Sequence, residues 1–147
     1  MRNAGQLLYL MVGLVAAAPV SAGPRPIKAP KRDVCVVNPT GGGSLNTFII
    51  RDVQPLSEGE AITLNGLFFT GAQKVAPFHG SAVMAMDGTV RLGLFVHSTA
   101  DSTNDFTVAG VTDTDFVGTW SFDNDGDFKP NGTLAMELRD CADITIP

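Results

Sequence analysis

The chain has 147 residues, of which 44% are hydrophobic, and its 15 acidic residues against 10 basic ones give a formal net charge of −5. This length predicts one domain that is large enough to bury a core of its own. The acidic balance argues against nucleic acid as a partner, because phosphate contacts require a basic surface.

The first 22 residues have the pattern of a secretory signal peptide. Arg2 provides a positive start, residues 7–18 form an apolar run too short to span a bilayer, and Pro19 is followed by small side chains up to Ala22. We therefore expect cleavage near Ala22 and a secreted or periplasmic mature protein. No later stretch approaches the length of a membrane span, so we expect no transmembrane segment in the mature chain.

Residues 23–33 predict a basic, proline-rich, flexible arm. The segment contains four basic side chains and three prolines ahead of its single acid, Asp33. Such a composition is typical of an extended, solvated terminus. An alternative role for the arm is attachment to an anionic surface, which would make the protein a structural or surface-assembly component.

Residues 34–147 predict a single all-β domain. Short β-rich runs alternate with Gly, Asp, Asn and Pro, and several runs alternate apolar with polar residues, as strands with one buried face do. The predicted strands cover 34–38, 46–53, 61–70, 79–86, 89–97, 105–109, 116–122 and 133–139. About eight strands in a domain of this size predict either a small antiparallel β-barrel or a two-sheet sandwich.

The turn at residues 87–88 has two candidate registers. A two-residue turn pairs Met86 with Thr89, whereas a three-residue loop pairs Ala85 with Thr89 and puts Gly88 in the left-handed region. With the three-residue loop, the two strands share one entirely apolar face. Because register follows the hydrophobic pattern, we predict the three-residue loop.

This register brings the two histidines of the chain together. It places His79 opposite Phe95, with His97 as a diagonal neighbour of His79. If consecutive strands run up and down, the loops 71–78, 98–105 and 123–132 share one end of the domain. Asp101 and Asp105 then lie near the histidines, and we predict that His79, His97, Asp101 and Asp105 form a ligand-binding site.

The sequence Asp-Asn-Asp-Gly-Asp at 123–127 is a candidate calcium loop. Asp123, Asp125 and Asp127 alternate, which is how calcium loops gather oxygen ligands. An EF-hand is excluded, because Phe128 stands where its glycine belongs and Leu134 stands where its bidentate glutamate belongs. The open alternatives are a looser calcium site and a polar β-turn.

Cys35 and Cys141 are the two cysteines of the chain. In an exported protein such a pair predicts a disulfide, here joining the first strand to the last. Metal binding is the alternative, but neither cysteine has another Cys or His close by in the sequence.

Residues 116–120 read Phe-Val-Gly-Thr-Trp, which resembles the Gly-x-Trp signature of lipocalins and fatty-acid-binding proteins. In those families the motif lies in the first strand, and the tryptophan closes a barrel that holds an apolar ligand. Here the motif falls in the seventh of eight predicted strands. We therefore interpret Trp120 as a core residue, in a domain whose size permits a ligand-holding barrel.

These observations predict a secreted or periplasmic non-enzymatic module that binds a small ligand, a glycan or a protein through the loops at one end. A structural protein attached by its arm is the alternative. A hydrolase is the third hypothesis, without assigned catalytic residues, because the sequence contains no local catalytic signature.

Overall fold

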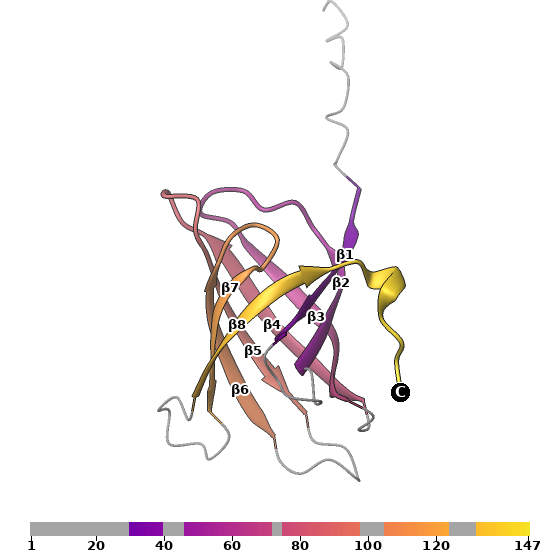
Figure 1. Cartoon of the computed structure of the whole chain (residues 1–147). Coiled ribbons are helices and arrows are strands. Elements are labelled where there is room, and N and C mark those ends of the chain that lie inside the picture. Colours follow the sequence, from indigo (N-terminus) through magenta and orange to yellow (C-terminus); the bar gives the residue numbers. More distant parts are fainter. Residues whose placement is uncertain (1–29, 40–45, 72–74, 98–104, 124–131) are drawn as a thin grey trace, which may run out of the picture.

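The computed structural model describes residues 30–39, 46–71, 75–97, 105–123 and 132–147. In these ranges eight antiparallel strands follow one another around a closed barrel, in which β8 pairs with β1 (Figure 1). The strands are β1 (Arg32–Val37), β2 (Asn46–Val53), β3 (Ala61–Thr70), β4 (Ala76–Met84), β5 (Val90–Val96), β6 (Phe106–Thr112), β7 (Gly118–Asp123) and β8 (Gly132–Arg139). The all-β prediction is confirmed, and the barrel is the correct alternative of the two.

The predicted leader, residues 1–22, lies outside the described residues, as does the arm up to residue 29. The first strand begins at Arg32, so the last two residues of the predicted arm belong to the barrel. No helix in the described ranges is long and apolar enough to cross a membrane.

The inside of the barrel is apolar because inward positions repeat with the period of two that a strand imposes. In β5, for example, Val90, Leu92, Leu94 and Val96 are all buried, whereas Arg91 between them is exposed. The largest fully buried side chains are Trp120, Phe48, Phe116, Ile50, Leu64 and Met136. These residues belong to the main core cluster, which fills the described interior of the barrel.

The β4–β5 hairpin has the predicted three-residue loop. The backbone N–H of Ala85 donates to the carbonyl oxygen of Thr89 at 2.8 Å, Gly88 has a φ of +81°, and Met84 pairs with Val90. The Thr89 hydroxyl and N–H donate to the Asp87 carboxylate at 2.6 and 2.9 Å. These two hydrogen bonds lower the pKa of Asp87, because they favour its charged form.

A glycine allows β4 and β5 to approach closely. A Cβ atom added at Gly80 would lie 2.0 Å from the carbonyl oxygen of Gly93 on the neighbouring strand. A Cβ added at Gly93 would meet nothing within 4 Å, because that position faces outward. Any side chain at Gly80 would therefore push the two strands apart.

A β-bulge between β1 and β2 is held by one carboxylate. The register shifts between Arg32 and Val34, and Asp52 on the opposite strand has a φ of +51°. Asp33 accepts the backbone N–H of Asp52 at 3.0 Å and Nη1 of Arg51 at 2.7 Å. Both bonds lower the pKa of Asp33, with the bond from Asp52 as the larger cause.

The predicted disulfide joins Cys35 to Cys141, with 5.3 Å between their Cα atoms. The sequence prediction placed its second half in the last strand, which is wrong. Cys141 begins the 3-10 turn η1 (Cys141–Asp143) just after β8, because Asp140 ends the strand and its side chain accepts the N–H of Ala142. The disulfide holds the C-terminal segment against the outside of the barrel, where Ile144 packs on a small second cluster that includes Phe69.

Candidate ligand-binding end of the barrel

The closed up-and-down topology fixes which strand ends lie together. Because neighbouring strands are antiparallel in chain order, the connections β1–β2, β3–β4, β5–β6 and β7–β8 emerge at one end of the barrel. We call this the loop end, and the opposite end the far end. The strand ends that flank the three predicted site loops therefore share the loop end, as expected from the sequence.

The structure brings His79 and His97 into direct contact on the outer face near the loop end. Nδ1 of His79 lies 2.7 Å from Nε2 of His97, and the ring centroids are 4.8 Å apart. The predicted strand register produces this contact, since His79 pairs with Phe95. The Phe95 ring lies 4.8 Å from the ring of His97 and 5.7 Å from that of His79, measured between centroids.

Of the two aspartates predicted beside the histidines, the structure describes one. Asp105 is exposed and comes directly before Phe106, which pairs with Val96 at the loop end. Asp101 lies outside the described residues. The convergence of all four predicted ligand-binding residues therefore stays a prediction, of which the histidine contact is the described part.

The candidate calcium loop is described only at its first residue. Asp123 ends β7, pairs with Thr107 and is 8% exposed. Asp125 and Asp127 lie outside the described residues. Within the described ranges no group of three or more His, Cys, Asp or Glu side chains is arranged to hold a metal ion. Calcium binding at this loop thus stays a prediction.

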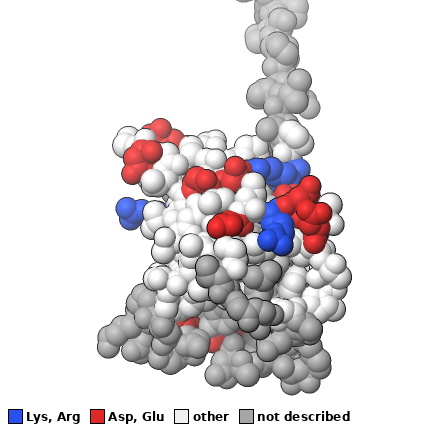
Figure 2. Space-filling model, viewed as in Figure 1, with Lys and Arg blue, Asp and Glu red and all other residues white. Residues whose placement is uncertain are grey.

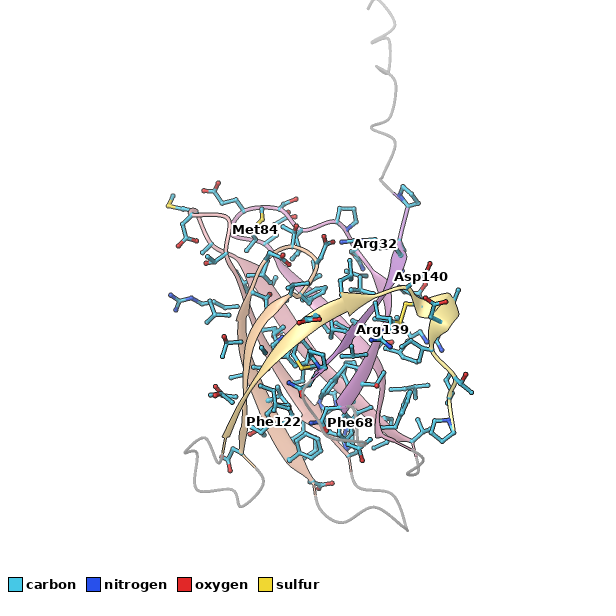
Figure 3. All side chains as sticks on the ribbon, in the orientation of Figure 1. Arg32, Phe68, Met84, Phe122, Arg139 and Asp140 are labelled. Carbon is cyan, nitrogen blue, oxygen red and sulfur yellow. A yellow bond between two sulfur atoms is a disulfide. The ribbon has the colours of Figure 1, made fainter. Side chains whose placement is uncertain are left out.

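Three phenylalanines line the inside of the barrel at the loop end. Phe68, Phe106 and Phe122 point inward and pack on the core, but each is only half-buried. The ring centroids of Phe68 and Phe106 are 5.1 Å apart, and those of Phe106 and Phe122 are 6.1 Å apart. We call these three residues the mouth ring. Figure 3 shows Phe68 and Phe122 at this end, opposite Arg32 and Met84.

The mouth ring continues inward as a column of aromatic side chains. Phe48 lies 4.7 Å from Phe68, 6.4 Å from Phe122 and 4.8 Å from Trp120, between ring centroids. Phe48 and Trp120 are both fully buried. Among these aromatic side chains, only the three of the mouth ring are therefore partly exposed to solvent.

Sequence reasoning did not identify the mouth ring as a site. The available signal was the alternation of inward and outward positions along each strand. Each of the three phenylalanines falls at an even spacing from a buried apolar residue of its own strand, so it faces inward too. Phe106, for instance, is two residues before the buried Val108, and Phe122 is two residues after Trp120.

At the far end the barrel is closed by a buried aromatic side chain, in contrast to the partly exposed mouth ring. Phe116 is fully buried there, in the turn between β6 and β7, although it adopts a φ of +62°. Beside it Arg32 forms an ion pair with Asp115. An open pocket of about 300 Å³ also lies at this end, lined by Pro30, Arg32, Val53, Gln54, Pro55, Leu56 and Thr114.

Charged side chains of the described residues lie on the outer surface of the far end, as Figure 2 shows for one face of the barrel. The exposed ion pair of Arg51 with Asp33, with 2.7 Å between Nη1 and Oδ2, joins β2 to β1 toward this end. The described inner surface at the loop end is instead aromatic, with Asn38 as a buried polar side chain that donates to the carbonyl oxygen of Ala135 at 2.9 Å.

Comparison with known proteins adds no relative: no family model, no curated protein and no solved structure matches the chain.

Proposed function

We propose that this chain is a secreted or periplasmic, non-enzymatic binding module that takes the apolar part of a ligand or partner at the loop end of its barrel. The observation that carries the proposal is the mouth ring. Aromatic side chains deeper in the barrel, such as Phe48 and Trp120, are fully buried, whereas Phe68, Phe106 and Phe122 keep part of their surface exposed. Aromatic side chains that are grouped together and partly exposed are typical of ligand sites.

The filled interior limits how the ligand binds. Because Phe48 and Trp120 occupy the barrel behind the mouth ring, a ligand contacts the ring rather than entering the full depth of the barrel. Burying roughly 100 Å² of additional apolar surface contributes about 2.5 kcal/mol. The proposal therefore favours a flat apolar or aromatic group, with further affinity supplied by polar contacts around the mouth.

The polar contacts proposed for the same ligand are His79, His97, Asp101 and Asp105. The two histidines stand on the outer face beside the mouth ring, so a ligand with a polar part extending over the edge of the barrel would contact them. Calcium at Asp123, Asp125 and Asp127 is an additional proposal at this end.

A neutral fluorescent probe, N-phenyl-1-naphthylamine, tests the proposal. Its binding is measured by the gain in its own emission and by energy transfer from Trp120, the single tryptophan. We expect binding to the full chain and a large loss of binding in Phe106→Ser. Phe95→Ser is the matched control, because Phe95 lies on the adjacent strand but on the outer face.

The outcomes separate the proposal from its alternative. Equal probe binding by both folded variants would contradict a site at the mouth ring. If the folded wild-type chain did not bind the probe at all, attachment through the basic arm would be the better account. That account predicts that deleting residues 23–29 releases the protein from the cell surface in a fractionation experiment.

A further inference from the structure

We propose that His79 and His97 form a two-imidazole site for a divalent transition metal, with Cu(II) preferred. The chain contains two histidines, and the barrel brings His79 of β4 next to His97, the residue that follows β5. Their ring nitrogens lie 2.7 Å apart. The two histidines, proposed above as polar contacts of the ligand, lie on the outer face of the sheet, so a metal that they hold stands outside the mouth ring.

Copper is the metal that a pair of imidazoles favours. With metal–nitrogen bonds of about 2.0 Å, two nitrogens on adjacent corners of a square lie about 2.8 Å apart, and two on a tetrahedron about 3.3 Å apart. The 2.7 Å between Nδ1 of His79 and Nε2 of His97 is the length of their hydrogen bond, so it brings both rings within reach of one ion but does not select the geometry of that ion. The preference for Cu(II) follows from the order of affinities, in which Cu(II) binds nitrogen sites more tightly than Ni(II) or Zn(II).

The protonation of the pair is compatible with metal binding. At 2.7 Å one ring nitrogen donates its proton to the other, so one of the two facing nitrogens carries a bare lone pair. When a metal binds, the hydrogen bond between the rings breaks, and the donating ring adopts its other tautomer, which moves the proton to its opposite nitrogen. The two rings then turn so that both lone pairs point at the metal.

The surroundings hold the two imidazoles next to each other. The backbone N–H of His97 donates to the carbonyl oxygen of Pro77 at 2.9 Å, which extends the β4–β5 pairing up to the site. The Phe95 ring packs against both imidazoles. Holding the ligands in place reduces the rotamer entropy that metal binding costs.

The chemistry of the donors separates this site from the candidate calcium loop. Calcium takes oxygen ligands, whereas imidazole nitrogen suits copper, nickel and zinc. Two protein ligands leave positions on the metal for water or for an atom of another molecule. The site would thus present an exposed metal on the outside of the barrel, beside its loop end.

Titration calorimetry and electron paramagnetic resonance with Cu(II) on the disulfide-intact full chain test the proposal. We expect one site with two nitrogen ligands in the hyperfine pattern and weaker binding of Zn(II). Because the second ligand of a chelate binds at high effective concentration, His79→Gln or His97→Gln should each weaken binding by about 100-fold. Thr107→Gln is the control on the same outer face and should bind Cu(II) as the wild type does.

A gain-of-affinity variant tests the placement directly. Asn65 pairs with His79 on β3, so Asn65→His adds a third imidazole next to the pair and should tighten Cu(II) binding. Cu(II) binding that survives unchanged in both glutamine variants would overturn the proposal, as would a spectrum without imidazole nitrogen. Neither result would bear on probe binding at the mouth ring, which is measured separately.

Discussion

The indole N–H of Trp120 donates a hydrogen bond to the carbonyl oxygen of Phe116 at 3.2 Å, and both side chains are fully buried. The bond links the core of β7 to a turn residue with a φ of +62°, a conformation that costs a bulky residue about 1–2 kcal/mol. The far end of the barrel is thereby filled by aromatic side chains, and the partly exposed aromatic surface is left at the loop end.

Replacing Trp120 should destabilise the barrel. Trp120→Phe leaves the buried carbonyl of Phe116 without its donor and removes core volume, so we expect a loss of about 2–4 kcal/mol. Urea unfolding followed by circular dichroism measures it as a lower midpoint at an unchanged slope. Thr119→Ala, on the exposed face next to it, should change stability by about 0.5 kcal/mol or less. Equal midpoints for the two variants would contradict the assigned role of the bond.

Asp33 should make stability depend on pH in the acid range. Its pKa in the folded state lies below the usual 3.8, so it stabilises the fold fully above about pH 4 and progressively less as the pH falls through its folded pKa. Asp33→Asn lacks this contribution. The difference in urea midpoint between wild type and variant should therefore be largest at pH 6 and shrink toward pH 2.5. Glu137→Gln controls for the loss of one exposed negative charge, and a pH-independent difference for Asp33→Asn would refute the assignment.

Replacement by alanine should destabilise the barrel at Gly80 but be tolerated at Gly93. Gly80→Ala forces a Cβ onto the backbone of the adjacent strand and should cost about 3 kcal/mol or more, or prevent folding. Gly93→Ala adds its Cβ in open space on the outer face, where alanine should be tolerated. The melting temperatures of the two variants test this prediction. A wild-type melting temperature for Gly80→Ala would contradict it, because it would show that the strands can separate there.

The disulfide should contribute strongly to stability. It closes a separation of 106 residues, for which the chain-entropy model gives about 4–5 kcal/mol. Cys35→Ala combined with Cys141→Ala should lower the urea midpoint accordingly. The folded, non-reduced wild type should contain no titratable thiol; finding two would contradict the pairing.

The strands and the β4–β5 register could be predicted because both depend on local patterns. The alternation of Val90, Leu92 and Leu94 with polar neighbours identifies the buried face, and Gly88 identifies the turn. Closure of the barrel could not be predicted, because β1 and β8 are far apart in the sequence and meet over only the three pairs Cys35–Arg139, Val36–Leu138 and Val37–Glu137. No local pattern distinguishes such a seam from the edges of a sandwich.

Only part of the candidate site could be predicted from the sequence. The contact between His79 and His97 followed from the register, since it needs only two neighbouring strands. The mouth ring draws Phe68, Phe106 and Phe122 from three strands, two of which lie far from the third in sequence. The partial exposure of these rings depends on where each strand ends around the closed barrel. The alternation of residues within one strand does not contain that information. Cys141 was misplaced by one element because β8 ends at Arg139 and the Asp140 side chain caps a 3-10 turn there, which the alternation of apolar and polar residues does not reveal.

Nuclear magnetic resonance mapping of the probe site tests the central claim most directly. In a titration of the full chain with N-phenyl-1-naphthylamine, we predict shifts of the mouth-ring aromatic signals and of the methyl groups of Val96 and Val108, which pair with Phe106 and Phe122. Shifts confined to Val53 and Leu56 in the far-end pocket, or to Val83 and Val111 on the outer face, would contradict binding at the loop end.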